Sequence, residues 1–151
     1  MRLADRVRED RGSIAPAVPI LVLVLLLLGG LVLDASRQLN ARGRAVAYAE
    51  EAARAGASAI VLDDPQLRLD EDEARRRVDA FCTTVRVSGA VTRCTFEGVQ
   101  PVSGSDDRRL VVQTRVELQI PATLLGIVGV STLSAAGDGR ARPYEGVDEG
   151  G

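Results

Sequence analysis

The sequence contains no histidine, no lysine and no tryptophan, and all nineteen of its basic residues are arginine. These absences remove the commonest general base, the commonest zinc ligand and any lysine that could form a Schiff base. Aromatic residues make up 3% of the 151 residues, which leaves few rings for stacking on nucleic-acid bases. The formal net charge is only -2, without the basic excess of a nucleic-acid-binding protein. We therefore expect no enzymatic activity, no cofactor, no metal site, no nucleic-acid partner and no small-molecule substrate.

A long uncharged stretch, SIAPAVPILVLVLLLLGGLVL, occupies residues 13–33. As a helix at about 1.5 Å per residue, it would span roughly 30 Å, the thickness of the hydrocarbon core of a bilayer. A secretory signal usually has a shorter apolar stretch followed by a small-x-small cleavage site, which Leu33 and Asp34 interrupt here. The pattern favours a single transmembrane helix that anchors the chain in the cell membrane. A cleaved signal peptide and a buried helix of a soluble protein are the alternatives.

Charges on the two sides of this stretch indicate its orientation. Residues 1–12 carry four arginines, Arg2, Arg6, Arg8 and Arg11, which favours a cytoplasmic N-terminal segment. The rest of the chain would then form an extracytoplasmic head. Near the outer end of the stretch, Gly29 and Gly30 offer a small-residue face where another helix can approach closely. Asp34 is interpreted as a charge that marks the membrane boundary.

The helix is expected to continue outside the membrane over residues 34–62, because this segment is rich in alanine and contains no proline. Asp63, Asp64 and Pro65 should end it. Four residues recur every seven positions and define a packing stripe: Leu39, Val46, Ala53 and Ile60. The opposite face is expected to be exposed to solvent. It carries Asn40, Arg44, Tyr48 and Glu51. The stripe packs either on the chain's own head or on helices of other subunits.

Residues 63–142 are predicted to form an α+β head. Asp70 can cap a second helix, which places five residues on one face: Ala74, Val78, Phe81, Cys82 and Val85. After Gly89, alternation predicts a strand with an inward face of Ala90, Thr92, Cys94 and Phe96. Cys82 and Cys94 would both point inward on the exported side and are candidates for a disulfide. Two reduced, buried thiols are the alternative.

The remainder of the head should complete a small antiparallel sheet. Residues 98–107 indicate a loop, and the following strand has Val112, Thr114, Val116, Leu118 and Ile120 on its inner face. Residues 121–130 are apolar but too short to span a membrane. They predict a turn tucked against the core, with contact to the bilayer surface or to a partner as the alternative. A poorly patterned last strand is expected over 131–142 and a disordered tail over 143–151. The expected fold is therefore α+β with about three antiparallel strands, similar in plan to pilins.

An ordered string of residues carries a resemblance to a known family. Asp10, Arg11, Gly12 and Ser13 precede the apolar stretch, and the extension holds Asp34, Arg37, Leu39, the pair Ala41-Arg42 and the run Ala52-Ala53-Arg54-Ala55-Gly56-Ala57. Over residues 10–60 the chain resembles the TadE/TadG-like proteins of Tad (Flp) pilus assembly. Downstream, the segments at residues 124–129 and 140–143 resemble those of the short actinobacterial-type members of that group. Members that resemble prepilins are cut after a glycine, so Gly12 and Ser13 are the candidate processing site. The fifth residue of the processed chain would then be Ala17, where prepilins carry glutamate.

The resemblance implies a non-catalytic, membrane-anchored component of a Tad/Flp-type pilus or secretion assembly, similar to a pseudopilin or minor pilin. Its implied partners are the lipid bilayer and other pilus-assembly or pilin subunits, contacted through the N-terminal helix. The competing hypothesis is an envelope-anchored sensory or ligand-binding ectodomain unrelated to pili.

Overall fold

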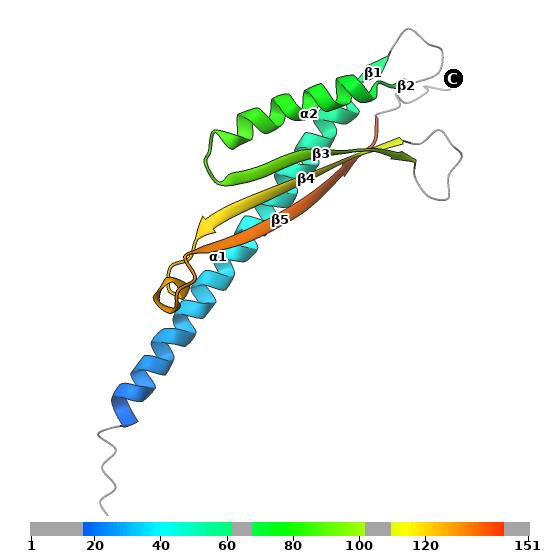
Figure 1. Cartoon of the computed structure of the whole chain (residues 1–151). Helices are drawn as coiled ribbons and strands as arrows, with labels where there is room; N and C mark the ends of the chain where they lie inside the picture. Colours follow the sequence, from blue (N-terminus) through cyan, green and yellow to red (C-terminus); the bar gives the residue numbers. More distant parts are fainter. Residues whose placement is uncertain (1–16, 62–67, 102–109, 144–151) are drawn as a thin grey trace, which may run out of the picture.

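The computed structural model describes residues 17–61, 68–101 and 110–143. In chain order its elements are α1 (Ala17–Ala57), β1 (Ile60–Val61), β2 (Arg68–Leu69), α2 (Glu71–Arg86), β3 (Val91–Pro101), β4 (Leu110–Pro121), the 3-10 helix η1 (Leu125–Val128) and β5 (Thr132–Ala141) (Figure 1). The predicted α+β fold with a long apolar helix, a second helix and three antiparallel strands is confirmed. The predicted cytoplasmic segment 1–12, the site at Gly12 and Ser13 and all but the first residue of the predicted tail lie outside the described residues.

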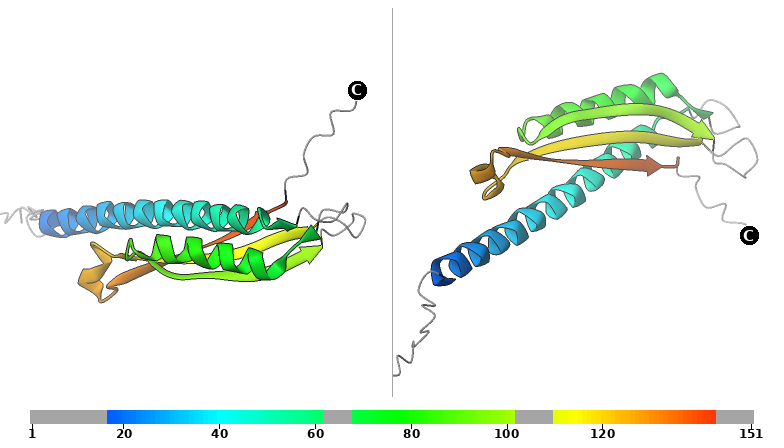
Figure 2. Two further views of the ribbon diagram at one scale, coloured as in Figure 1. Left: turned by 90° about the horizontal axis from the view of Figure 1, so that it is seen from above. Right: turned by 60° about the horizontal axis from the view of Figure 1, so that its bottom comes forward.

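Strands β3, β4 and β5 form an antiparallel sheet in that order, and β1 pairs separately with β2. Both helices cover the same face of the larger sheet. The Thr114 hydroxyl on β4 donates a hydrogen bond to the Ala49 carbonyl of α1, and Cys94, opposite the neighbouring inward residue Val116, is joined to Cys82 of α2. The sheet therefore packs on the C-terminal half of α1, while the N-terminal half of the helix projects beyond the head (Figures 1 and 2).

The contact between α1 and the sheet is built from small residues. The buried residues in the C-terminal half of α1 are Ala41, Ala45, Ala49, Ala52, Ala53, Gly56 and Ala57, and the buried face of β5 consists of Ala135, Gly137, Gly139 and Ala141. A Cβ atom at Gly137 would overlap the backbone of Ala45 and Val46, and one at Gly139 would overlap the backbone of Ala49 and Glu50. Backbone therefore lies directly against backbone here, which only glycine permits.

This contact explains why the packing stripe differs from the expected one. The buried positions in the C-terminal half of α1 follow the 3.6-residue period of a helix, and all of them are alanine or glycine. Leu39 is expected in the packing stripe but is 71% exposed. Tyr48 is expected on the solvent-exposed face but packs against the core. The helix also ends at Ala57, before the predicted end at residue 62, and Ile60 lies in β1.

Two other elements match the sequence pattern closely. Asp70 caps α2, since its side chain accepts a hydrogen bond from the Glu73 backbone N–H. Ala74, Val78 and Cys82 are buried on one face of this helix, as predicted. On β4, the inner face of Val112, Thr114, Val116 and Leu118 is buried, also as predicted, with Ile120 half-buried.

The inward face predicted for β3 is wrong at its start. Pairing with β4 shifts register between Val91 and Arg93, so Val91 is buried and Thr92 is exposed. A bulge adds a residue and reverses the alternation, which periodicity alone does not reveal. The loop predicted over 98–107 begins later, because β3 continues to Pro101 through a second register shift at Gly98, whose φ is +123°. Residues 102–107 of that loop lie outside the described residues.

We expect Gly139→Ala to destabilise the head, because its methyl group would force β5 away from α1. Overpacking of this kind costs about 1–3 kcal/mol of unfolding free energy, and a clash with backbone belongs at the upper end. Urea denaturation of the protein in detergent, followed by circular dichroism, measures the change.

Gly43→Ala is the matched control, because a Cβ atom at Gly43 meets no atom within 4 Å. This exposed helical position should gain about 0.5–1 kcal/mol from the higher helix propensity of alanine. Equal effects of the two substitutions would show that β5 does not lie in close contact with α1.

Candidate functional site

The N-terminal half of α1 presents apolar side chains in all directions. From Val18 to Leu33 every leucine, valine and isoleucine is about half exposed or more, with fractions between 47% and 65%. A helix that is apolar all round and uncovered by its own protein needs an apolar environment. Within the part of the chain that the structure describes, α1 is the one helix long and apolar enough to cross a membrane.

Asp34 lies where this apolar surface ends, and it is buried at 1% exposure. Its carboxylate accepts hydrogen bonds from the backbone N–H groups of Thr123 at 3.0 Å, Leu124 at 3.0 Å and Leu125 at 2.9 Å. These bonds hold the start of η1 against α1. Arg37, one turn along α1, donates a hydrogen bond to the Thr123 hydroxyl. The interpretation of Asp34 as a boundary charge alone is therefore wrong, because its side chain ties the head to the helix.

The same hydrogen bonds change the acidity of Asp34. Donation by the Leu125 N–H, followed by that of Thr123, favours the ionised carboxylate and lowers the pKa of Asp34 below its ordinary value, against the opposing effect of burial. The ionised form of Asp34 therefore favours the docked position of the loop.

Gly30 supplies the second contact between α1 and this loop. Gly30 is buried, and a Cβ atom there would overlap the side chain of Leu124. Gly29 beside it is open, since a Cβ atom added at this position would meet no atom within 4 Å. Of the predicted helix-packing positions, the structure therefore uses Gly30 and Ala53 inside the chain, half-buries Val46, and leaves Gly29 and Leu39 free on the outside.

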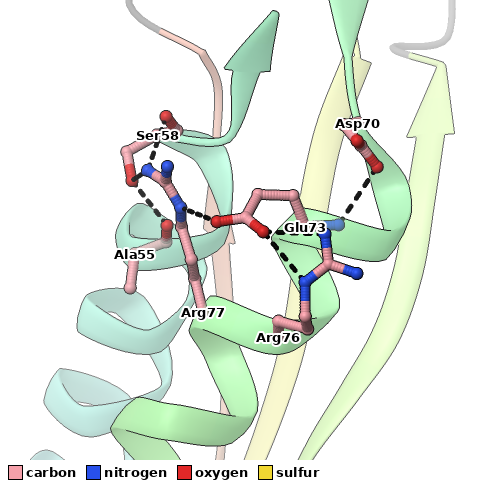
Figure 3. Close-up of polar contacts among 6 residues, drawn as sticks. All are labelled: Ala55, Ser58, Asp70, Glu73, Arg76 and Arg77. Atoms are coloured by element: carbon pink, nitrogen blue, oxygen red, sulfur yellow. Dashed lines mark hydrogen bonds and ion pairs between the residues drawn. The ribbon is translucent and has the colours of Figure 1, made fainter.

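Polar contacts also secure the other end of α1 (Figure 3). Arg77 of α2 donates from Nη1 to the carbonyl and the hydroxyl oxygen of Ser58, both at 2.8 Å. Glu73 accepts from Nε of Arg77 at 2.8 Å and from Nε of Arg76 at 2.9 Å. These bonds, that of Arg77 first, lower the pKa of Glu73. A cation beside the last carbonyls of a helix is favourable, so this group fixes α2 on the end of α1.

The two candidate cysteines are brought together by α2 and β3. The structure joins Cys82 and Cys94 as a disulfide, with their Cα atoms 5.5 Å apart, and both residues are buried. The bond links α2 to the edge of the sheet on the side away from β5.

A shallow cleft lies where β5 passes α1. It has a volume of about 350 Å³ and is lined by polar and charged residues that include Gln38, Arg42 and Arg115. Gln38 donates to the Ser134 carbonyl at 3.4 Å, and Arg115 pairs with Asp138 at 2.9 Å. Gln38 therefore links α1 to β5, whereas the Arg115–Asp138 pair joins β4 to β5 within the sheet.

Comparison with known proteins finds a family match over the segment that contains α1. Residues 12–59 match the family described as putative Flp pilus-assembly TadE/G-like, which confirms the resemblance predicted from the sequence. The chain therefore carries a TadE/G-like segment, which covers about a third of its length and contains the whole of α1. No curated protein and no solved structure matches the chain.

Sequence reasoning found the apolar helix but missed the role of Asp34. The signal that could have revealed it was an isolated acidic residue directly after a long apolar stretch, combined with an uncharged, glycine-containing segment at residues 121–133 that needs partners for its backbone.

We expect Asp34→Asn to release the loop at residues 122–131 from α1. An asparagine amide lacks the charge and presents a donor where N–H groups need acceptors. Hydrogen–deuterium exchange of the Thr123, Leu124 and Leu125 amides should accelerate, as measured by mass spectrometry. Glu51→Gln, on the exposed face of α1, is the control and should leave this exchange unchanged.

The docking should also depend on pH in the wild-type protein. Because the folded pKa of Asp34 is lowered, the ionised carboxylate stabilises the docked loop above the ordinary aspartate pKa of about 3.9. That contribution is lost as the pH falls through the lower folded pKa. An Asp34→Asn variant with the same acid dependence of loop exchange as the wild type would contradict this role.

Proposed function

We propose that the protein is a non-catalytic, membrane-anchored component of a Tad/Flp-type pilus or secretion assembly, similar to a pseudopilin or minor pilin. The observation that carries the proposal is the coincidence of the TadE/G-like match, residues 12–59, with α1. One half of that helix has an uncovered apolar surface, and the other half is fixed to a folded head. The N-terminal half of α1, within the segment shared with the family, is thus free to contact lipid and other helices.

In this proposal the span of residues 13–33 crosses the membrane once, with its N-terminus in the cytoplasm and the head outside. The arginines at positions 2, 6, 8 and 11 support this orientation. The cysteine pair supports it as well, because disulfides persist in oxidising compartments.

The helix is proposed to contact other pilus subunits with the surface that the head leaves free. Gly29 offers close approach within the membrane, and Leu39 offers a large apolar side chain just outside it. Leu39 points away from the core, so its side chain does not contribute to the stability of the head. The head covers the opposite side of α1 and restricts packing to this one.

Deletion of the gene should abolish surface pili or pilus-dependent secretion, as seen by electron microscopy and by assay of the culture medium. Complementation with the wild-type gene should restore both. Normal pili in the deletion strain would contradict the proposal.

Complementation with Leu39→Arg should fail, because a charge on the free face opposes helix packing. Val87→Arg is the matched control: Val87 is also exposed, at 86%, but it lies at the end of α2. Both variants should reach wild-type amounts in the membrane. Full activity of Leu39→Arg would exclude this face as the contact surface.

We further propose that the anchor is retained without processing at Gly12, because Ala17 occupies the position where prepilins carry glutamate. The intact mass of protein from native membranes should therefore correspond to the full chain. Without reduction it should be lighter by the two hydrogens that a Cys82–Cys94 disulfide removes. A mass lacking residues 1–12 would contradict retention, and an unchanged mass on reduction would contradict the disulfide.

A further inference from the structure

We propose that the loop of residues 122–131, which contains η1, is a second membrane contact that places Ile127 and Val130 in the interfacial region of the bilayer. The inference rests on the proposed anchoring of α1 in the membrane. It adds a lipid-binding surface on the head itself, far from the helix in sequence.

The position of the loop along α1 is the first argument. Leu124 packs on Gly30, which lies three residues before the end of the apolar stretch at Leu33. At about 1.5 Å per residue, Gly30 is roughly 4–5 Å on the membrane side of that end. Figure 1 shows η1 beside α1 at the end of the head nearest the apolar half of the helix, beyond α2 and the strands, and both views in Figure 2 agree.

The large exposed side chains of the loop are apolar, and its exposed polar residues, Thr123 and Ser131, carry no charge. Ile127 is 74% exposed and Val130 is 42% exposed. No charged residue occurs between Pro121 and Leu133. Two charged residues of α1 bond to the loop: the Asp34 carboxylate accepts from its backbone, and Arg37, on the head side of Asp34, donates to the Thr123 hydroxyl. This surface therefore continues the apolar surface of α1, which is the reason to assign lipid as its occupant.

The backbone of the loop is also prepared for a medium without water. Asp34 accepts from the N–H groups of three consecutive residues, Thr123 to Leu125. Inside the loop, Ile127 N–H donates to the Leu124 carbonyl and Val130 N–H to the Leu125 carbonyl, both at 3.0 Å. Unsatisfied backbone groups are the main cost of inserting a loop into a membrane, and these bonds remove much of that cost. The buried carboxylate thus serves lipid insertion as well as docking.

The absence of tryptophan from the chain makes a direct test practical. Full-length protein carrying a single Ile127→Trp substitution is reconstituted into phosphatidylcholine vesicles, with and without bromine on the acyl chains near the headgroup. We expect emission shifted to shorter wavelengths and a loss of intensity in the brominated vesicles. Val87→Trp, at the exposed end of α2, is the matched control and should show neither change.

Leu25→Trp, near the middle of the apolar stretch and tested in vesicles with bromine near the ends of the acyl chains, separates the two proposals. Quenching of Leu25→Trp but not of Ile127→Trp would overturn the loop contact and leave the anchor in place. Absence of quenching at both positions would overturn the anchor and the loop contact together. A shifted emission of Ile127→Trp without bromine quenching would mean that protein, such as a second copy of the chain, covers the loop, which also overturns the lipid contact.

Discussion

The close approach of α1 and β5 is the contact on which the rest of the head depends. Aromatic residues make up 3% of the chain, so its core cannot be filled by large rings and is closed instead by bringing backbones together. Glycines on β5 face alanines on α1, and the neighbouring strand adds the hydrogen bond from Thr114 to the Ala49 carbonyl. With β5 and β4 fixed in this way, α2 packs beside them on α1, and β3 pairs with β4 and packs against α2.

Three local ties complete this arrangement, each of a different chemical kind. A buried carboxylate, Asp34, holds the loop at one end of the head, and the guanidinium of Arg77 holds α2 at the other. The Cys82–Cys94 disulfide joins α2 to the sheet. The Asp34 and Arg77 ties lie at the two ends of the contact between α1 and the sheet, where they use charge in place of packing. The disulfide lies within the buried core and adds a covalent bond there. Together they leave only one side of α1 exposed along the head.

The sequence allowed much of this to be predicted because several elements obey simple periodic rules. The alternation in β4, the capping residue Asp70 and the uncharged stretch before Asp34 each report a local property. What escaped prediction depends on neighbours that are distant in the chain. The bulge at Thr92 is set by pairing with β4, and β5 looks poorly patterned because its buried side consists of alanine and glycine. The role of Asp34 depends on residues about ninety positions later.

Continuity of α1 has a geometric consequence for the whole protein. The helix runs from Ala17 to Ala57 as one element, and the head attaches to it from Gly30 onward. When the apolar half of α1 rotates about its axis or tilts, the head therefore rotates and tilts with it. An additional residue between Leu33 and Ala41 would turn one half by about 100° relative to the other and lengthen the helix by about 1.5 Å. The length of this segment therefore sets how the apolar half of α1 is rotated relative to the half that carries the sheet.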